Sequence, residues 1–159
     1  MTGRIHIISH SFMSNKTRSA ASRRKSKLNK IFQSKTYFEQ DPYFQMKEVP
    51  RQGSYEVRSL NEIRAKIKGG EIFLEVSEKW QDGKKISFQY KVKTTSVSCS
   101  AENHANGAKY CGEYMFRYEE HIEGSMGHHL HVMDNIPPHF LVKNIEIEDL
   151  LNLIETDFI

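Results

Sequence analysis

The sequence lacks the features that would place it in a membrane or in the secretory pathway. It has no run of about 18 apolar residues, the length that a transmembrane helix needs, and its first residues lack the apolar stretch of a secretory signal. Two cysteines, Cys99 and Cys111, in 159 residues are too few for a disulfide framework. We therefore expect a soluble, cytoplasmic protein with no membrane partner, whose cysteines are free thiols.

Several motifs of well-known enzymes are also missing. There is no glycine-rich phosphate loop and no internal repeat. The carboxylates do not form the cluster that a two-metal nuclease needs on converging strands. A chain of 159 residues is long enough for one sizeable core and too short for two. The sequence thus predicts one domain whose chemistry, if any, lies outside these motifs.

The basic residues are unevenly distributed. Residues 1–38 contain nine Lys and Arg and no acid, which leaves 14 basic against 20 acidic residues in the rest of the chain. We expect residues 1–36 to form a basic N-terminal arm, partly helical or disordered, and residues 37–159 to form the domain. Such an arm gains counterion-release free energy on a polyphosphate. It would also suit an acidic partner protein, or it neutralises the acidic body, or it is a solvated tail. The candidate nucleic-acid-binding residues are Arg18, Arg23, Arg24, Lys25, Lys27 and Lys30.

Two hairpins are the clearest secondary-structure signals. Residues 84–94 alternate apolar and polar side chains, the period of a half-buried strand. Asp82-Gly83 joins them to the strand-like residues 71–80 in the manner of a tight hairpin turn, and the outer face of this hairpin is expected to be basic. A second pair of strands is predicted at 111–122 and 128–134. Together these segments predict a four-stranded antiparallel meander.

Helical signals lie on both sides of the meander in the sequence. Residues 19–33 have helical apolar spacing, although the first half of this segment is too polar to pack. Ser59 and Glu62 match a capping box, which predicts a helix that ends at Gly69-Gly70. The residues between these two segments are expected to be irregular, with the rings of residues 37–44 on the core.

The C-terminal residues 144–158 complete the predicted fold. They carry an apolar stripe, with Asn144 as the N-cap and acids in the first turn. The expected fold class is α+β: a four-stranded antiparallel meander packed against this C-terminal helix and one further helix, with a basic N-terminal arm.

The histidines are concentrated in one region. Six of the eight fall in residues 104–139, and a strand at 128–134 would place His129 and His131 on one face. Such a pair can supply two ligands to zinc or another transition metal, with a third from Asp134, His139, His121 or Cys111. Other interpretations are a small zinc site of Cys99, His104 and Cys111, or a solvent-facing strand that binds nothing. We expect no resident cofactor.

A metal-free interpretation uses the same histidines. Histidine is the natural general acid or base near neutral pH. A cross-strand approach of Arg117 to His129 or His131 would add a cation that stabilises charge on a phosphate in the transition state. An ion pair of Arg117 with Glu119 or Glu148 is the structural alternative. The candidate catalytic residues are His129, His131, Arg117, Asp134 and His139.

Two strings around these residues resemble a known family. Tyr114–Tyr118 (YMFRY), followed by Met133–His139 (MDNIPPH), resembles the TumE-like toxin family of bacterial and archaeal toxin–antitoxin pairs. That family has a tyrosine-rich strand, a turn, and a strand that runs into an Asp-Asn-x-Pro-His string. Here Pro138 is inserted before His139. The resemblance implies a small toxin made together with an antitoxin, and it emphasises Asp134, Asn135 and His139.

These observations lead to one expectation and one alternative. The chain is expected to be a toxin-like, RNA-directed protein, plausibly a metal-independent endoribonuclease that an antitoxin neutralises. The alternative is a non-enzymatic module that binds nucleic acid or protein, in which the histidines form a surface feature or a structural metal site. Neither the oligomeric state nor the order of the strands follows from the sequence.

Overall fold

The computed structural model describes residues 5–50, 52–68, 70–93, 114–120, 129–132, 140–142 and 145–159. Within these residues the chain forms two helices and eight strands. The elements are α1 (Ile5–Gln33), β1 (Phe44–Val49), β2 (Ser54–Ser59), β3 (Ile63–Ile67), β4 (Gly70–Gln81), β5 (Lys84–Lys93), β6 (Tyr114–Glu120), β7 (His129–Val132), β8 (Phe140–Leu141) and α3 (Ile147–Asp157).

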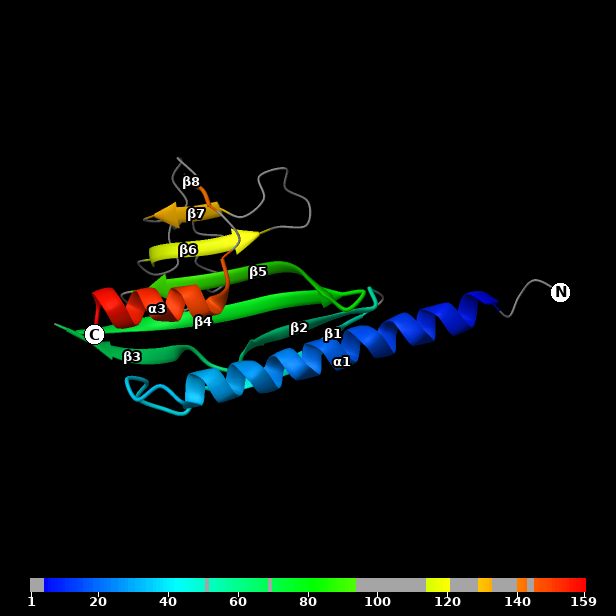
Figure 1. Cartoon of the computed structure of the whole chain (residues 1–159), viewed down its shortest axis with the longest axis horizontal. Coiled ribbons are helices and arrows are strands. Elements are labelled where there is room, and N and C mark those ends of the chain that lie inside the picture. Colours follow the sequence, from blue (N-terminus) through cyan, green and yellow to red (C-terminus); the bar gives the residue numbers. More distant parts are fainter. Residues whose placement is uncertain are drawn as a thin grey trace, which may run out of the picture.

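The strands form one antiparallel sheet in the order β1-β2-β4-β5-β6-β7-β8, with β3 also paired to β4. The 12-residue β4 accommodates both β2 and β3 because β3 pairs with its first half and β2 with its second half. Figure 1 shows α1 running along β1 and β2, and α3 in front of β4 and β5. The α+β class, with an antiparallel meander and two helices, is confirmed.

The β4–β5 hairpin forms where the alternation predicted it. Asp82 and Gly83 have φ angles of 51° and 77°, the left-handed conformations that a two-residue hairpin turn requires. This turn also meets α1, since Thr17 Oγ1 accepts a hydrogen bond from the Gly83 amide at 3.1 Å. A Cβ added at Gly83 would lie 3.0 Å from Cε of Lys16. Glycine is therefore required here for its backbone conformation and for close approach to the helix.

The helix predicted to start at Ser59 is wrong, because these residues form the end of β2 and all of β3. Ile63 and Ala65 are buried while their neighbours along β3 are more exposed, so the segment also fits a period of two residues. The long β4 supplies its hydrogen-bonding partner, and this pairing overrides the local helical signal. Ser59 Oγ accepts a hydrogen bond from the Val76 amide at 3.3 Å instead of capping a helix.

The segment before β3 is more regular than predicted. It forms the β1–β2 hairpin, which pairs Phe44 with Ser59 and Val49 with Ser54. Three of the four rings predicted to lie on the core do so, because Tyr37, Phe38 and Phe44 pack against it. Tyr43 does not, and its side chain is 61% exposed.

Helix α1 is longer than predicted, and its polar half packs on the sheet. Thr17, Ala20 and Ala21 are buried together with Leu28 and Phe32. The expectation that the first half of residues 19–33 is too polar to pack is therefore wrong. Small side chains, rather than large apolar ones, let this half of the helix approach the sheet. Much of the basic N-terminal segment thus belongs to the same core as the rest of the domain.

Helix α3 closes the core as its sequence pattern predicted. Its buried stripe consists of Ile147, Leu150, Leu151 and Ile154. The predicted cap, Asn144, lies outside the described residues. The N-cap of α3 is Glu146, whose carboxylate and that of Asp149 form a reciprocal capping box.

One apolar residue of the alternating segment 84–94, Ile86, is not in the core, although the alternation predicts that it is. The register between β4 and β5 shifts next to Lys79 and Trp80, and this bulge leaves Ile86 only half-buried. Phe88, two residues later, is 4% exposed and stacks on Tyr90 with 4.7 Å between ring centroids. Phe88, together with Tyr90 and Val92, thus fills the core from this strand.

We predict that Leu150→Ala lowers the free energy of unfolding by about 2 to 5 kcal/mol, because truncating a fully buried leucine removes apolar contacts and leaves a cavity. Phe88→Ala should lower the free energy of unfolding by a similar amount, whereas Ile86→Ala should lower it clearly less. Urea denaturation monitored by circular dichroism would measure all three. Equal losses at Ile86 and Phe88 would contradict the placement of the bulge.

Candidate functional site

Six basic side chains lie outside the packed side of α1, Arg18 and Lys25 along the flank that also carries Asn29 and the other four along the opposite flank. Buried Ala21, Leu28 and Phe32 define the packed side, and the period of 3.6 residues places the basic residues on the remaining surface. The helix contains no acidic residue. We call this surface the cationic face of α1. It consists of Lys16, Arg18, Arg23, Lys25, Lys27 and Lys30, all of which are exposed except the half-buried Lys25.

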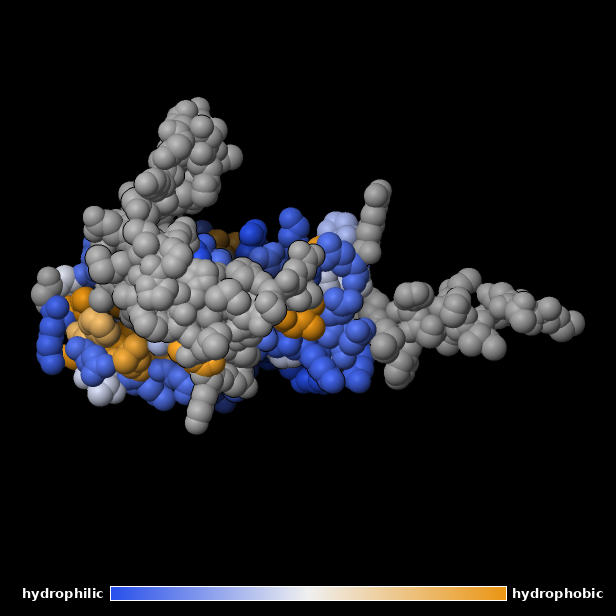
Figure 2. All heavy atoms as spheres, turned by 90° about the horizontal axis from the view of Figure 1, so that it is seen from above, coloured by the Kyte–Doolittle hydropathy of each residue, from blue (hydrophilic) through white to orange (hydrophobic). Residues whose placement is uncertain are grey.

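Most of this charge is not neutralised by the described part of the chain. There, Arg18, Arg23, Lys25 and Lys30 form no ion pair. Lys27 lies 2.7 Å from Glu148 but remains 60% exposed. The upper side of the molecule, opposite α1, also has a mostly hydrophilic described surface with small hydrophobic areas (Figure 2). Charge is thus the main feature that the cationic face offers to a partner.

Arg24 was predicted to bind nucleic acid, but it turns into the protein. Its side chain is 9% exposed, and its Nε and Nη2 donate hydrogen bonds to the fully buried carboxylate of Glu78 at 2.9 and 2.6 Å. Burial alone would lower the pKa of Arg24, but the hydrogen bonds and charge of Glu78 raise it above its ordinary value. Arg24 is therefore a structural residue that is not available to a ligand on the surface.

The Glu78 carboxylate receives further hydrogen bonds from the sheet. The Tyr90 hydroxyl donates to it at 2.7 Å and the Trp80 indole at 3.2 Å. Burial, together with the charge of Glu78, raises the pKa of Tyr90, so its hydroxyl stays protonated as a donor. With these partners and Arg24, both carboxylate oxygens are satisfied in the core.

The network extends from Arg24 to the start of α3. Arg24 Nη2 lies 3.5 Å from Glu146, and its Nη1 lies 3.5 Å from Glu148. Lys85 of β5 binds Glu146 at 2.7 Å and the Tyr90 hydroxyl at 3.3 Å. One arginine thereby connects α1, the sheet and α3.

The other side of the sheet carries a row of polar residues from four neighbouring strands. Positions that oppose one another in an antiparallel ladder share one face of the sheet. The adjacent positions along β4 and β5 hold core residues, so this row lies on the face away from the helices. We call it the polar row, and its register runs through Glu75 in β4, Lys91 in β5, Arg117 in β6 and His131 in β7.

The lysines at this face are paired with carboxylates. Glu75 lies 3.3 Å from Lys91 and 2.6 Å from Lys93, and Lys93 also contacts Glu62. Burial alone would raise the pKa of Glu75, but these two lysines hold it below its ordinary value. The outer face of this hairpin thus carries the expected lysines, but carboxylates offset their charge. Lys93 is only 1% exposed.

The structure brings together two of the predicted catalytic residues at the level of the backbone. Arg117 directly opposes His131, whereas His129 opposes Glu119. Asp134 and His139 lie outside the described residues, as do Cys99, Cys111, His104 and His121. Of the two carboxylates expected as structural partners of Arg117, Glu148 instead pairs with Lys27 and Arg24.

The two predicted parts of the site lie on opposite sides of the sheet. The cationic face belongs to α1, which packs over the apolar side through Leu28 and Phe32. Arg117 and His131 belong to the polar row on the other side. The sheet and the helix layer separate the two. One extended ligand can touch both only by passing around an edge of the sheet.

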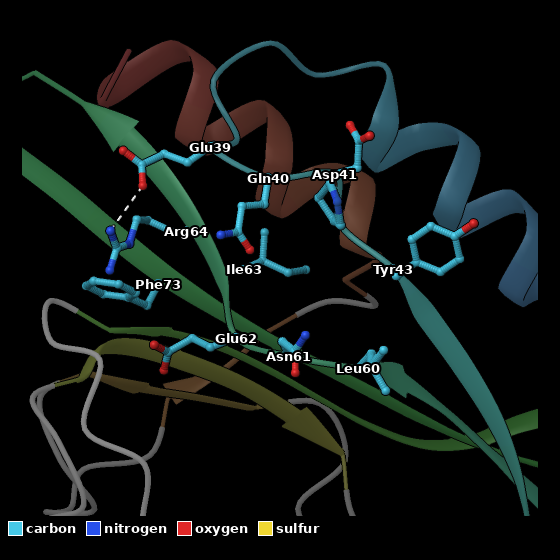
Figure 3. Close-up of a pocket in the computed structure, with 11 residues that line it drawn as sticks. Glu39, Gln40, Asp41, Tyr43, Leu60, Asn61, Glu62, Ile63, Arg64 and Phe73 are labelled. Carbon is cyan, nitrogen blue, oxygen red and sulfur yellow. Dashed lines mark hydrogen bonds and ion pairs between the residues drawn. The ribbon is translucent and has the colours of Figure 1, made fainter.

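A hollow that the sequence did not indicate lies between the loop 39–43 and the β2–β3 connection. Its volume is about 220 Å³, and Figure 3 shows Gln40 and Ile63 near its middle with Glu39 and Arg64 at one side. Glu39 already accepts a hydrogen bond from Arg64 at 3.1 Å. A sequence pattern could not reveal the hollow because its two loops meet only through the sheet.

No family model matches the chain, and no curated protein and no solved structure is significantly similar to it. The resemblance to the TumE-like family therefore stays a prediction. The described residues hold no group of three or more His, Cys, Asp or Glu that could bind a metal ion. None of the described helices is long and apolar enough to span a membrane.

We predict that Arg24→Ala lowers the free energy of unfolding by about 3 to 5 kcal/mol, because it leaves the Glu78 carboxylate buried without its cation. Arg23→Ala, at the neighbouring exposed position, should change it by less than about 0.5 kcal/mol. Chemical denaturation of the two variants measures the difference. Similar values for both would show that Arg24 is not part of the core.

Proposed function

We propose that the chain binds RNA through the cationic face of α1. The observation that carries this proposal is a helix with no acidic residue whose exposed side holds six basic residues, four of them without an ion pair in the described part of the chain. Phosphate contacts of this kind supply most of the sequence-independent affinity for nucleic acids.

The geometry of α1 suits an extended phosphate backbone. Lys16 and Lys30 are 14 residues apart, about 21 Å along a helix, so the face can contact several phosphates in a row. The helix is anchored to the sheet by Arg24 and by the hydrogen bond between Thr17 and Gly83. Its cations are therefore held in place before RNA binds, which reduces the ordering cost of binding.

The anchoring also decides how the proposal can be tested. An arm outside the domain, as the sequence predicts, could be deleted without unfolding the rest. Because Leu28 and Phe32 of α1 are fully buried in the core, deletion of residues 1–34 should instead unfold the domain. Point substitutions on the exposed side of α1 are the appropriate test.

We predict that the double substitution Arg23→Gln and Lys30→Gln weakens binding of a single-stranded RNA and flattens its salt dependence. Each lost phosphate contact should reduce the slope of log K against log salt concentration by about 0.7, hence by about 1.4 for the pair. Fluorescence anisotropy at several salt concentrations measures the slope. The control is Lys47→Gln with Lys68→Gln, two exposed lysines outside α1. An equal loss in the control would mean that total charge, not this face, determines binding.

A second candidate function is RNA cleavage at the polar row. The observation that favours it is the direct register of Arg117 with His131, next to Lys91. A histidine can take the proton of a ribose 2′-hydroxyl, which then attacks the neighbouring phosphorus while the bond to the 5′-oxygen breaks. Arg117 would stabilise the charge on the phosphate in the transition state. This chemistry needs the 2′-hydroxyl, so it favours RNA over DNA.

The remaining predicted residues would complete this site. We assign His129 as the acid that protonates the leaving 5′-oxygen, Asp134 as the carboxylate that orients a histidine, and His139 as a further histidine of the same reaction. The chain would then be a toxin-like endoribonuclease that needs no metal, as the resemblance to TumE-like toxins implies. RNA would reach this site around an edge of the sheet from the cationic face.

We predict that His131→Ala, Arg117→Ala and His139→Ala each abolish RNA cleavage while the melting temperature stays unchanged, because removing an acid, a base or a charge stabiliser raises the transition state and not the folded state. Cleavage of a labelled RNA should also persist in excess chelator. Gel analysis of the products gives the rates. If purified wild-type protein binds RNA but never cleaves it, the binding function stands alone.

A further inference from the structure

The outer edge of β1 is the longest strand edge left unpaired in the described residues. β1 ends the sheet on one side, and β8 at the other end has only two residues. The outer edge of β3 is covered by residues 37–39, through the bridge of Phe38 with Ala65 and the bond from the Lys66 amide to the Tyr37 carbonyl at 2.9 Å. An open edge is a template for an added strand.

The register shows which backbone groups face this edge. The Leu60 amide donates to the Tyr43 carbonyl at 2.8 Å, so these two residues form a hydrogen-bonded pair of the antiparallel ladder. Such pairs alternate with pairs whose amides and carbonyls point away from the partner strand. Phe44, the next residue, follows this rule because its amide donates outward, to Asn29 Oδ1 of α1 at 2.8 Å.

The alternation continues along β1. Met46 and Glu48 are the next positions whose amides and carbonyls face outward, whereas Gln45 and Lys47 bond to β2. No described residue hydrogen-bonds to the outward groups of Met46 or Glu48. Helix α1 thus occupies the first outward amide of the edge and leaves the following two for a partner.

Helix α1 places cations beside this edge. Asn29 marks the side of the helix that faces β1, and Lys25, Ser22 and Arg18 follow on the same side at intervals of three and four residues. Figure 1 shows α1 running along β1. Lys25 is half-buried and Arg18 is exposed. An added strand would therefore lie next to two positive charges.

We propose that the β1 edge binds an extended, acidic segment of a partner protein as an additional strand. The outward amides and carbonyls of Met46 and Glu48 require alternating acceptors and donors, which a peptide backbone has and an RNA backbone lacks. Arg18 and Lys25 select a segment with acidic side chains on alternate positions.

The proposal connects to RNA binding in one respect only. Arg18 and Lys25 also belong to the cationic face of α1, so on the function proposed above the bound segment and RNA would exclude each other. A protein that supplies such a segment would then block RNA binding. The binding of the segment itself does not depend on whether the chain binds RNA.

The test uses a fluorescein-labelled ten-residue peptide of alternating valine and glutamate, added to the full chain without RNA. We expect saturable binding by fluorescence anisotropy. Methylation of alternate peptide amides should weaken it at least tenfold, because the added strand can no longer donate to β1. Substitution of the glutamates by lysine should abolish it. Equal binding of the methylated peptide would overturn the proposal, since the attraction would then be charge alone.

Protein variants locate the site. Arg18→Glu with Lys25→Glu should weaken peptide binding at least tenfold. Arg23→Glu with Lys30→Glu is the matched control, because it changes the net charge equally on the solvent side of α1, and it should leave peptide binding within twofold. Circular dichroism melting confirms that both variants fold. Equal losses in the two variants would overturn the proposal.

Amide hydrogen exchange followed by NMR identifies the edge directly. Peptide addition should slow exchange at Met46 and Glu48, whereas Gln45 and Lys47 should be slow already. No change at Met46 and Glu48 would overturn the proposal. Protection of these two amides by RNA but not by the peptide would also overturn the proposal. If the peptide binds but RNA does not, the strand-binding role of the β1 edge is supported and the proposed RNA-binding function is contradicted.

Discussion

The buried ion pair between Arg24 and Glu78 is the interaction on which the arrangement of the protein depends. Both charges are removed from water, a cost that is offset only when geometry and hydrogen bonding are nearly complete. Here the arginine donates three hydrogen bonds, and Tyr90 and Trp80 donate two more to the same carboxylate. Because Arg24 also approaches Glu146 and Glu148, it fixes α1 and α3 relative to the sheet.

The inward position of the Arg24 side chain determines which other side chains of α1 are exposed. A helix has one rotational setting in which Arg24 reaches Glu78, and in that setting Ala21, Leu28 and Phe32 are buried while Arg23 and Lys30 face the solvent. The hydrogen bonds that the Gly83 amide donates to Thr17 and the Phe44 amide donates to Asn29 hold the helix near both ends of its packed length. The buried Arg24 thus determines the direction in which the exposed basic side chains of α1 point.

The sheet separates the surfaces to which we assign the proposed functions. One side carries the helices, with the cationic face of α1 and the open edge of β1. The other side carries the polar row, whose Glu75 already forms ion pairs with Lys91 and with the nearby Lys93. Arg117 and His131 belong to this second side. The proposed binding of RNA and the proposed cleavage at the histidines therefore need not occur together.

The sequence by itself determined the parts whose signals are local. Alternation with Asp82-Gly83 predicted the β4–β5 hairpin, apolar spacing predicted α3 and the second half of α1, and the two later strands allowed a cross-strand approach of Arg117 to His129 or His131. Tertiary structure decided the rest. The segment after Ser59 satisfied both a helical and a strand period, and only pairing with β4 selected the strand. The sequence pattern does not distinguish Arg24 from its basic neighbours, because its partner Glu78 is 54 residues away. Local patterns record the period of a segment, but pairing and burial depend on which distant residues face it.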